Sequence, residues 1–134
     1  MSHDGHTHLV TLFVERAKDG ADPDDRLWAH VEGGKERTVY QYRFEPPFGA
    51  VRVQVGKPNT VLVRLKAGEG IALHDLRIES DPYHQLRVVR DKCGPREFVI
   101  ENENERVQVA YYSIFVKAGD AVLACDPMIF NRPR

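Results

Sequence analysis

Cysteine is scarce in this chain, which has only Cys93 and Cys125 among its 134 residues. The two do not form a Cys-x-x-Cys pair, the spacing typical of redox and zinc sites. With the cytoplasmic location inferred below, they are expected to be free thiols rather than a disulfide. Cys125 ends an apolar run and is predicted to be buried, whereas Cys93 lies in a Lys-Cys-Gly-Pro turn, where its thiol could be accessible.

Long apolar runs are also missing. No segment approaches the roughly 20 apolar residues that a membrane-spanning helix needs. The N-terminal sequence MSHDGHTH is polar and the apolar piece that follows, Leu9–Val14, is short. A secretory signal instead has a basic start and an apolar stretch of about 7–15 residues. We therefore expect a cytoplasmic protein with no membrane partner.

The chain has no excess charge of either sign, since 19 basic and 20 acidic residues leave a formal charge of −1. Basic residues alternate singly with apolar ones, as at Arg52, Arg64, Arg77 and Arg87. Nucleic-acid-binding proteins usually cluster their Lys and Arg side chains. The pattern argues against a nucleic-acid partner and places these arginines on solvated faces of strands.

Helical periodicity is nearly absent, and alternation of apolar and polar residues takes its place. In Thr38–Glu45, for example, Tyr40, Tyr42 and Phe44 alternate with polar residues. The predicted strands are Leu9–Arg16, Leu27–Glu32, Thr38–Glu45, Val51–Val55, Thr60–Lys66, Ile71–Glu79, Leu86–Arg90, Glu97–Glu101 and a C-terminal pair. Short strands at spacings of about 8–12 residues, separated by turn residues, are typical of an antiparallel two-sheet β-sandwich. We expect one all-β domain over residues 9–134, preceded by a flexible arm over residues 1–8.

The last third of the chain predicts a β-hairpin, in which Val107–Val116 and Ala121–Cys125 are joined by a Gly119-Asp120 turn. Apolar residues at successive positions of the first run indicate a strand buried on both faces. Asp126-Pro127 is expected to close the second strand, because a residue before proline is held extended. Asn131–Pro133 is then predicted to be a further turn.

The same residues allow a functional interpretation. Tyr111, Asp126 and Asn131 carry groups that could bind a ligand in a pocket at one end of the sandwich, and they are our candidate ligand-binding residues. The structural alternative is that Asp126 and Asn131 only turn the chain.

Two groups of residues suggest metal binding. His3, His6 and His8 lie close together, and imidazole is the commonest ligand for zinc, copper and nickel. Carboxylates gather in Asp22–Asp25 and in Glu101–Glu105, where they could bind Ca²⁺. Neither acidic segment has the EF-hand pattern, and polar termini and acidic turns are common without a ligand. We predict no cofactor and keep metal binding as an alternative.

No catalytic set emerges from the spacing. Ser113 lies within an aromatic strand without a nucleophile elbow, and no glycine-rich loop precedes a helix. His74 falls on the apolar face of its predicted strand, which indicates a core or half-buried side chain. His84 is predicted to lie in a loop, and nothing in the spacing selects a nucleophilic pair with Cys93. We therefore predict no catalytic residues.

A family resemblance comes from the C-terminal motif: Tyr111-Tyr112-Ser-Ile-Phe-Val116, a Gly-Asp turn, then Asp126-Pro127-Met-Ile-Phe-Asn131-Arg-Pro133. It resembles the DP-EP family of small, functionally uncharacterised bacterial β-sandwich proteins. The resemblance implies an immunoglobulin-like shape and brings no activity. Whether Glu45-Pro46, which lies early in the chain, corresponds to the second dipeptide of that family is left open.

These observations favour a non-enzymatic binding or self-associating module, with an unknown ligand or a second copy of the chain as partner, which would make it a homo-oligomer. Strands supply broad faces and aromatic side chains, while no catalytic set accompanies them. The first alternative is a metal-binding protein that uses the N-terminal histidines or the acidic loops. The second is a small-molecule enzyme with a site near Asp126-Pro127.

Overall fold

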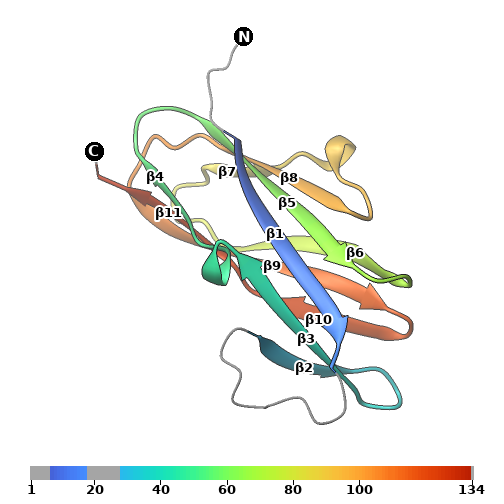
Figure 1. Cartoon of the computed structure of the whole chain (residues 1–134). Coiled ribbons are helices and arrows are strands. Elements are labelled where there is room, and N and C mark those ends of the chain that lie inside the picture. The colour runs from blue at the N-terminus through green and yellow to red at the C-terminus, as the bar shows by residue number, and fades with distance from the viewer. Residues whose placement is uncertain (1–6, 18–27, 134) are drawn as a thin grey trace.

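Eleven β-strands in two stacked sheets make up the fold, seen in a computed structural model that describes residues 7–17 and 28–133 (Figure 1). The first sheet has the spatial order β2 (Ala29–Gly33), β3 (Thr38–Glu45), β1 (Thr7–Arg16), β5 (Asn59–Ala67), β8 (Glu97–Asn102) and β7 (Leu86–Val88). The second contains β6 (Ile71–Ser80), β9 (Gln108–Ala118), β10 (Ala121–Cys125), β11 (Met128–Arg132) and β4 (Val51–Gln54). The predicted all-β, two-sheet fold is confirmed. Thr7 and His8, which we assigned to the flexible arm, begin β1, and residues 1–6 lie outside the described part.

Both sheets are mixed, whereas we expected antiparallel pairing throughout. β1 runs parallel to β5, from Thr7 opposite Thr60 onward, and β11 runs parallel to β4, with Ile129 opposite Val51. The remaining pairs are antiparallel. The difference could not be seen in the sequence, because a strand with one buried face alternates with the same period in either direction.

The core lies between the two sheets and is built by the alternation that the sequence shows. Val10 and Leu12 of β1 and Val61 of β5 are fully buried on the inner face of the first sheet. Ile114 and Val116 of β9 oppose them from the second sheet and are equally buried. Each such side chain contributes about 1.5–3 kcal/mol of apolar burial, which is the main force that holds the sheets together.

His74 does not lie where the alternation predicts, because β6 contains a β-bulge. The register between β6 and β9 shifts between Leu73 and Asp75, so that Leu73 and Leu76 both point into the core. His74 is exposed instead of half-buried. The extra residue of a bulge reverses the alternation beyond it, which a strict period of two cannot anticipate.

β10 and β11 are two halves of one long strand. Cys125 lies opposite Ile114, and the same register continues three residues later, where Met128 lies opposite Tyr111. Asn131 is therefore a strand residue, and the predicted turn at Asn131–Pro133 is wrong. β10 ends at Cys125, as predicted from Asp126-Pro127, and the pairing with β9 resumes at Met128.

The outer face of β9 is less buried than its apolar sequence predicts. Val109 is 38% exposed and Tyr111 is 48% exposed, because nothing among the described residues covers that face completely. The prediction of a strand buried on both faces is therefore wrong for this half of β9.

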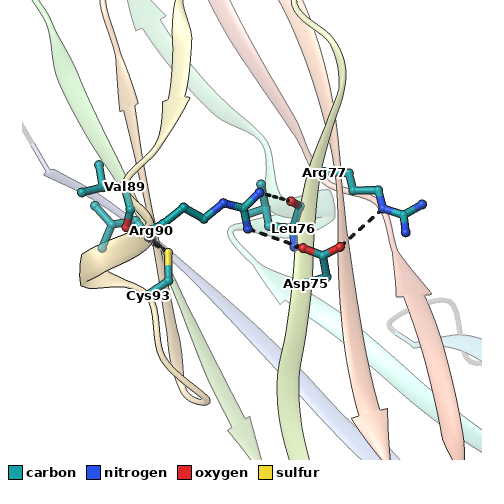
Figure 2. Close-up of polar contacts among 7 residues, drawn as sticks. Asp75, Leu76, Arg77, Val89, Arg90 and Cys93 are labelled. Carbon is teal, nitrogen blue, oxygen red and sulfur yellow. Dashed lines mark hydrogen bonds and ion pairs between the residues drawn. The ribbon is translucent and has the colours of Figure 1, made fainter.

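The two sheets are also joined at their surface, beside the 3-10 turn η2 (Arg90–Lys92). Figure 2 shows Arg90 reaching across to β6, where its guanidinium donates to the carbonyl of Leu76 at 3.4 Å and pairs with Asp75 at 3.5 Å. Burial alone would raise the pKa of Asp75, but the backbone amide of Leu76 and two neighbouring guanidinium groups outweigh it and hold the pKa below its usual value. Because 66% of the Arg90 side chain and 35% of the Asp75 side chain are exposed, water and salt screen this contact, and it fixes position more than it adds stability.

Helical structure in the described residues amounts to two three-residue 3-10 turns, η1 (Pro47–Gly49) and η2. Neither has the length or the apolar character to cross a membrane.

The two cysteines differ in accessibility, which gives a first prediction. Cys125 is fully buried, and burial together with the neighbouring charge of Asp126 raises its pKa to about 12. Cys93 is only partly buried and donates a hydrogen bond to the carbonyl of Val89 at 3.2 Å (Figure 2). At pH 8, Ellman's reagent should modify one thiol in the native protein and two in denaturant, since the neutral thiol is unreactive. The Cys93→Ser variant should show no native labelling; rapid modification of Cys125 in that variant would contradict the structure.

Candidate functional site

A hollow of about 600 Å³ opens beside the point where the chain leaves β3 and crosses to the second sheet through η1. We call it the aromatic hollow. It is lined by Trp28, Ala29, Tyr42, Arg43, Phe44, Glu45, Pro47, Phe48 and Asp126. Its volume lies in the range of about 300–1,000 Å³ that is usual for small-molecule sites.

The aromatic walls come from β3 and the turn after it. Tyr42 and Phe44 alternate onto the inner side of β3, where their rings meet edge to face with centroids 6.0 Å apart. The chain then passes through a cis Glu45–Pro46 bond into η1. Phe48 stands at the rim with 77% of its surface exposed and a backbone φ of +60°, a conformation uncommon for a bulky residue. An aromatic ring is thus held in solvent beside the hollow.

Asp126 supplies a carboxylate from the opposite side, at the interruption between β10 and β11. Its Oδ1 accepts a hydrogen bond from the Ser113 hydroxyl at 2.9 Å. Among the described residues no Lys, Arg or His side chain forms an ion pair with it. The pKa of Tyr42 is raised mainly by burial and then by the charges of Cys125 and Asp126. The Asp126 carboxylate therefore acts on the phenol group of Tyr42.

Arg43 carries the positive charge of the hollow, and that charge is already engaged. Its guanidinium lies 4.1 Å from the ring centroid of Phe13 and 5.2 Å from that of Trp28. It also donates to Glu45 at 2.8 Å. Since Arg43 balances Glu45, the charge of Asp126 is left over and the lining carries a net charge of −1.

The three residues predicted to bind a ligand are not brought together. Asp126 lines the aromatic hollow, but Tyr111 lies on the outer face of β9. Asn131 faces inward on β11 with 1% exposure, and its side chain bonds to that of Asn102 at 2.8 and 3.2 Å. Tyr111 and Asn131 thus lie on opposite faces of the second sheet.

Most residues of the aromatic hollow could not be predicted from the sequence. Trp28, Tyr42 and Phe48 were assigned to strands or turns without a role. The aromatic density of Tyr40–Phe48 beside Glu45-Pro46 was the one available indication, since Trp28 and Asp126 are far away in the sequence.

The metal alternatives find no support among residues 7–17 and 28–133, where no three His, Cys, Asp or Glu side chains lie close enough to hold a metal ion. The Glu101–Glu105 segment, considered above for calcium, lies within the described residues and contains no such group of carboxylates. His8 lies on β1, partly buried. His3, His6 and the Asp22–Asp25 loop lie outside the described residues.

Comparison with known proteins adds little to this geometry. No protein-family model matches the chain, and no curated relative is found. Among solved structures, the chain is similar to the inclusion body protein PixA from Burkholderia cenocepacia J2315, with 4% sequence identity and a TM-score of 0.33 over 98% of this chain and 96% of that one. A similarity at this level carries no argument about function.

Proposed function

We propose that this protein is a non-enzymatic binding module whose aromatic hollow holds a small organic cation, a molecule with an apolar body and an ammonium group. The observation that carries the proposal is the pairing of four aromatic side chains with an unbalanced carboxylate. Trp, Tyr and Phe rings attract cations through their negative faces, and cages of such rings recognise ammonium groups. Asp126 adds the matching charge from the side opposite β3.

The only tryptophan of the chain, Trp28, lines the hollow and serves as a built-in reporter. Its fluorescence should change on titration with benzyltrimethylammonium, with benzyl alcohol as the neutral probe and phenylacetate as the anionic one. We expect the cation to bind at least about five times more tightly than the alcohol, which corresponds to about 1 kcal/mol, with phenylacetate the weakest.

The variant Asp126→Asn should reduce the preference for the cation to near unity and leave benzyl alcohol binding unchanged. Glu69→Gln, which removes an exposed carboxylate from the β5–β6 turn, is the matched control and should behave like the wild type. Equal affinities for the three probes, or a cation preference that survives in Asp126→Asn, would refute the proposal.

Membership in the DP-EP family is also a proposal. What supports it beyond the C-terminal motif is that Glu45 and Asp126 line the same hollow. In addition, Gly49, at the end of the turn that follows Glu45-Pro46, lies against Pro127. Self-association and a cytoplasmic location remain predictions, and light scattering over a range of concentrations tests the first of them.

A further inference from the structure

A second hollow lies where β4 leads into β5, and we call it the basic groove. Its volume is about 630 Å³. The charged residues that line it include Arg52, Lys57 and Arg132, and no Asp or Glu is among the described residues of its wall. It is formed from different residues than the aromatic hollow.

The three cations have no carboxylate partner among residues 7–17 and 28–133. None of them forms an ion pair with a described Asp or Glu. The guanidinium of Arg52 lies 5.0 Å from the ring centroid of Phe130, its neighbour on β11. Arg132 follows two residues later on β11, opposite Gln54. Charges of one sign that line a concave wall concentrate the potential there and favour an anion.

Two buried asparagines give the wall a second property. Asn59 is 6% exposed, yet neither its Nδ2 nor its Oδ1 has a hydrogen-bond partner among the described residues. Asn104 is 2% exposed, and its Oδ1 is likewise without a partner. Both residues line the groove. An unpaired buried polar atom costs about 1–3 kcal/mol, so a molecule that bonds to these atoms would be strongly favoured.

The turn that carries Lys57 is held in place by Asn104. The Nδ2 of Asn104 donates to the carbonyls of Gln54 at 2.7 Å and of Lys57 at 2.9 Å. The amide of Gly56 donates in turn to the Asn104 carbonyl at 3.0 Å. Lys57, which supplies positive charge to the groove, and Asn104, which supplies an unpaired oxygen, are therefore held in a fixed relative position.

We propose that the basic groove binds a small molecule that carries an oxyanion, either phosphate or carboxylate, together with a hydroxyl or amide group. The oxyanion interacts with Arg132, Lys57 and Arg52, because guanidinium and ammonium groups form short, strong bonds to such oxygens. The hydroxyl or amide group reaches the Asn59 side chain, which offers both a donor and an acceptor.

Calorimetric titration with three probes tests the ligand class. Glycerol 3-phosphate and glycerate carry an oxyanion and hydroxyl groups, and glycerol carries hydroxyl groups alone. We expect at least one of the two anions to bind at least about ten times more tightly than glycerol, and the tighter one identifies the oxyanion. Equal binding of glycerol and both anions would overturn the proposal.

Variants of the wall test its residues. Arg132→Gln and Lys57→Gln should each weaken binding of the preferred anion by about tenfold, whereas Lys92→Gln in η2, which changes the net charge equally, should have no effect. Asn59→Leu should lose binding without a drop in the melting temperature, since its side-chain amide bonds to none of the described residues. Unchanged affinity in Arg132→Gln would overturn the proposal. So would strong destabilisation of Asn59→Leu, because it would show that the Asn59 amide already bonds to a water or to the chain itself. The fluorescence of Trp28 with benzyltrimethylammonium should stay unchanged in all of them, so this test is separate from that of the aromatic hollow.

Discussion

Replacing Asn131 by leucine should lower the free energy of unfolding by about 2–3 kcal/mol. Asn131 and Asn102 are each 1% exposed and bridge the two sheets through two reciprocal hydrogen bonds of 2.8 and 3.2 Å. Leucine has a similar volume but leaves the Nδ2 of Asn102 buried without its acceptor. Such an orphaned donor costs about 1–3 kcal/mol in addition to the bond that is lost. Urea denaturation monitored by circular dichroism measures the change.

Asn59→Leu is the matched control, because the same substitution is made at a buried asparagine whose side chain has no hydrogen-bond partner in the described part of the chain. It should change the free energy of unfolding by less than about 0.5 kcal/mol or raise it. The double variant Asn102→Leu/Asn131→Leu should lose less stability than the sum of the two single variants, since both members of the bond are then removed together. Additive losses, or an Asn131→Leu variant as stable as the wild type, would show that the bridge does not hold the sheets.

The pairing of Asn131 with Asn102 also explains why the role of Asn131 could not be predicted from the sequence. Asparagine followed by arginine and proline resembles a turn, and an exposed turn asparagine is a good candidate for ligand binding. The partner that decides its role, Asn102, lies 29 residues earlier on the other sheet. Local composition carries no information about that contact, so the polar bridge could not be distinguished from a site.

Most of the strands were predictable, because each has one face toward the core and one toward water, but β11 was missed because its end was taken for a turn. β3 begins and ends at the predicted residues, Thr38 and Glu45. The order of the strands was not predictable, and neither were the parallel pairs of β1 with β5 and β11 with β4. Alternation defines which residues point inward within one strand, but it is the same for every neighbour that the strand could have.

The aromatic hollow shows the same limit at the level of a site. Asp126 was a candidate, because a carboxylate before proline is conspicuous. Its surroundings come from Trp28 before β2, from β3 and from η1, which meet Asp126 only after the chain has crossed between the sheets. The residues of a hollow formed by such a crossing can be assigned a role only when the topology of the strands is known.

Gly49→Ala should be among the most damaging substitutions of a single small residue, with a loss of about 2–5 kcal/mol. The register that pairs Ile129 with Val51 brings Pro127 close to Gly49. A Cβ at position 49 would lie 2.5 Å from the Cβ of Pro127, closer than contact allows, and 3.2 Å from the Cδ1 of Phe44, which is tighter than most contacts. Gly49 also has a φ of +63°, which costs a residue with a side chain about 1–2 kcal/mol. The steric overlap adds about 1–3 kcal/mol, because neither ring can move freely.

Gly119→Ala separates the two contributions. Gly119, in the β9–β10 turn, has nearly the same φ of +60°, but a Cβ there would meet nothing within 4 Å. It should therefore lose only the conformational part, and the difference between the two variants in urea denaturation measures the overlap with Pro127. Pro127→Gly removes the clashing atom, so in a Pro127→Gly background the added cost of Gly49→Ala should shrink by at least about 1 kcal/mol. Equal stability of Gly49→Ala and Gly119→Ala would contradict this prediction. It would show that Pro127 does not hold the turn after Glu45-Pro46, which positions Phe44 and Phe48 in the wall of the aromatic hollow.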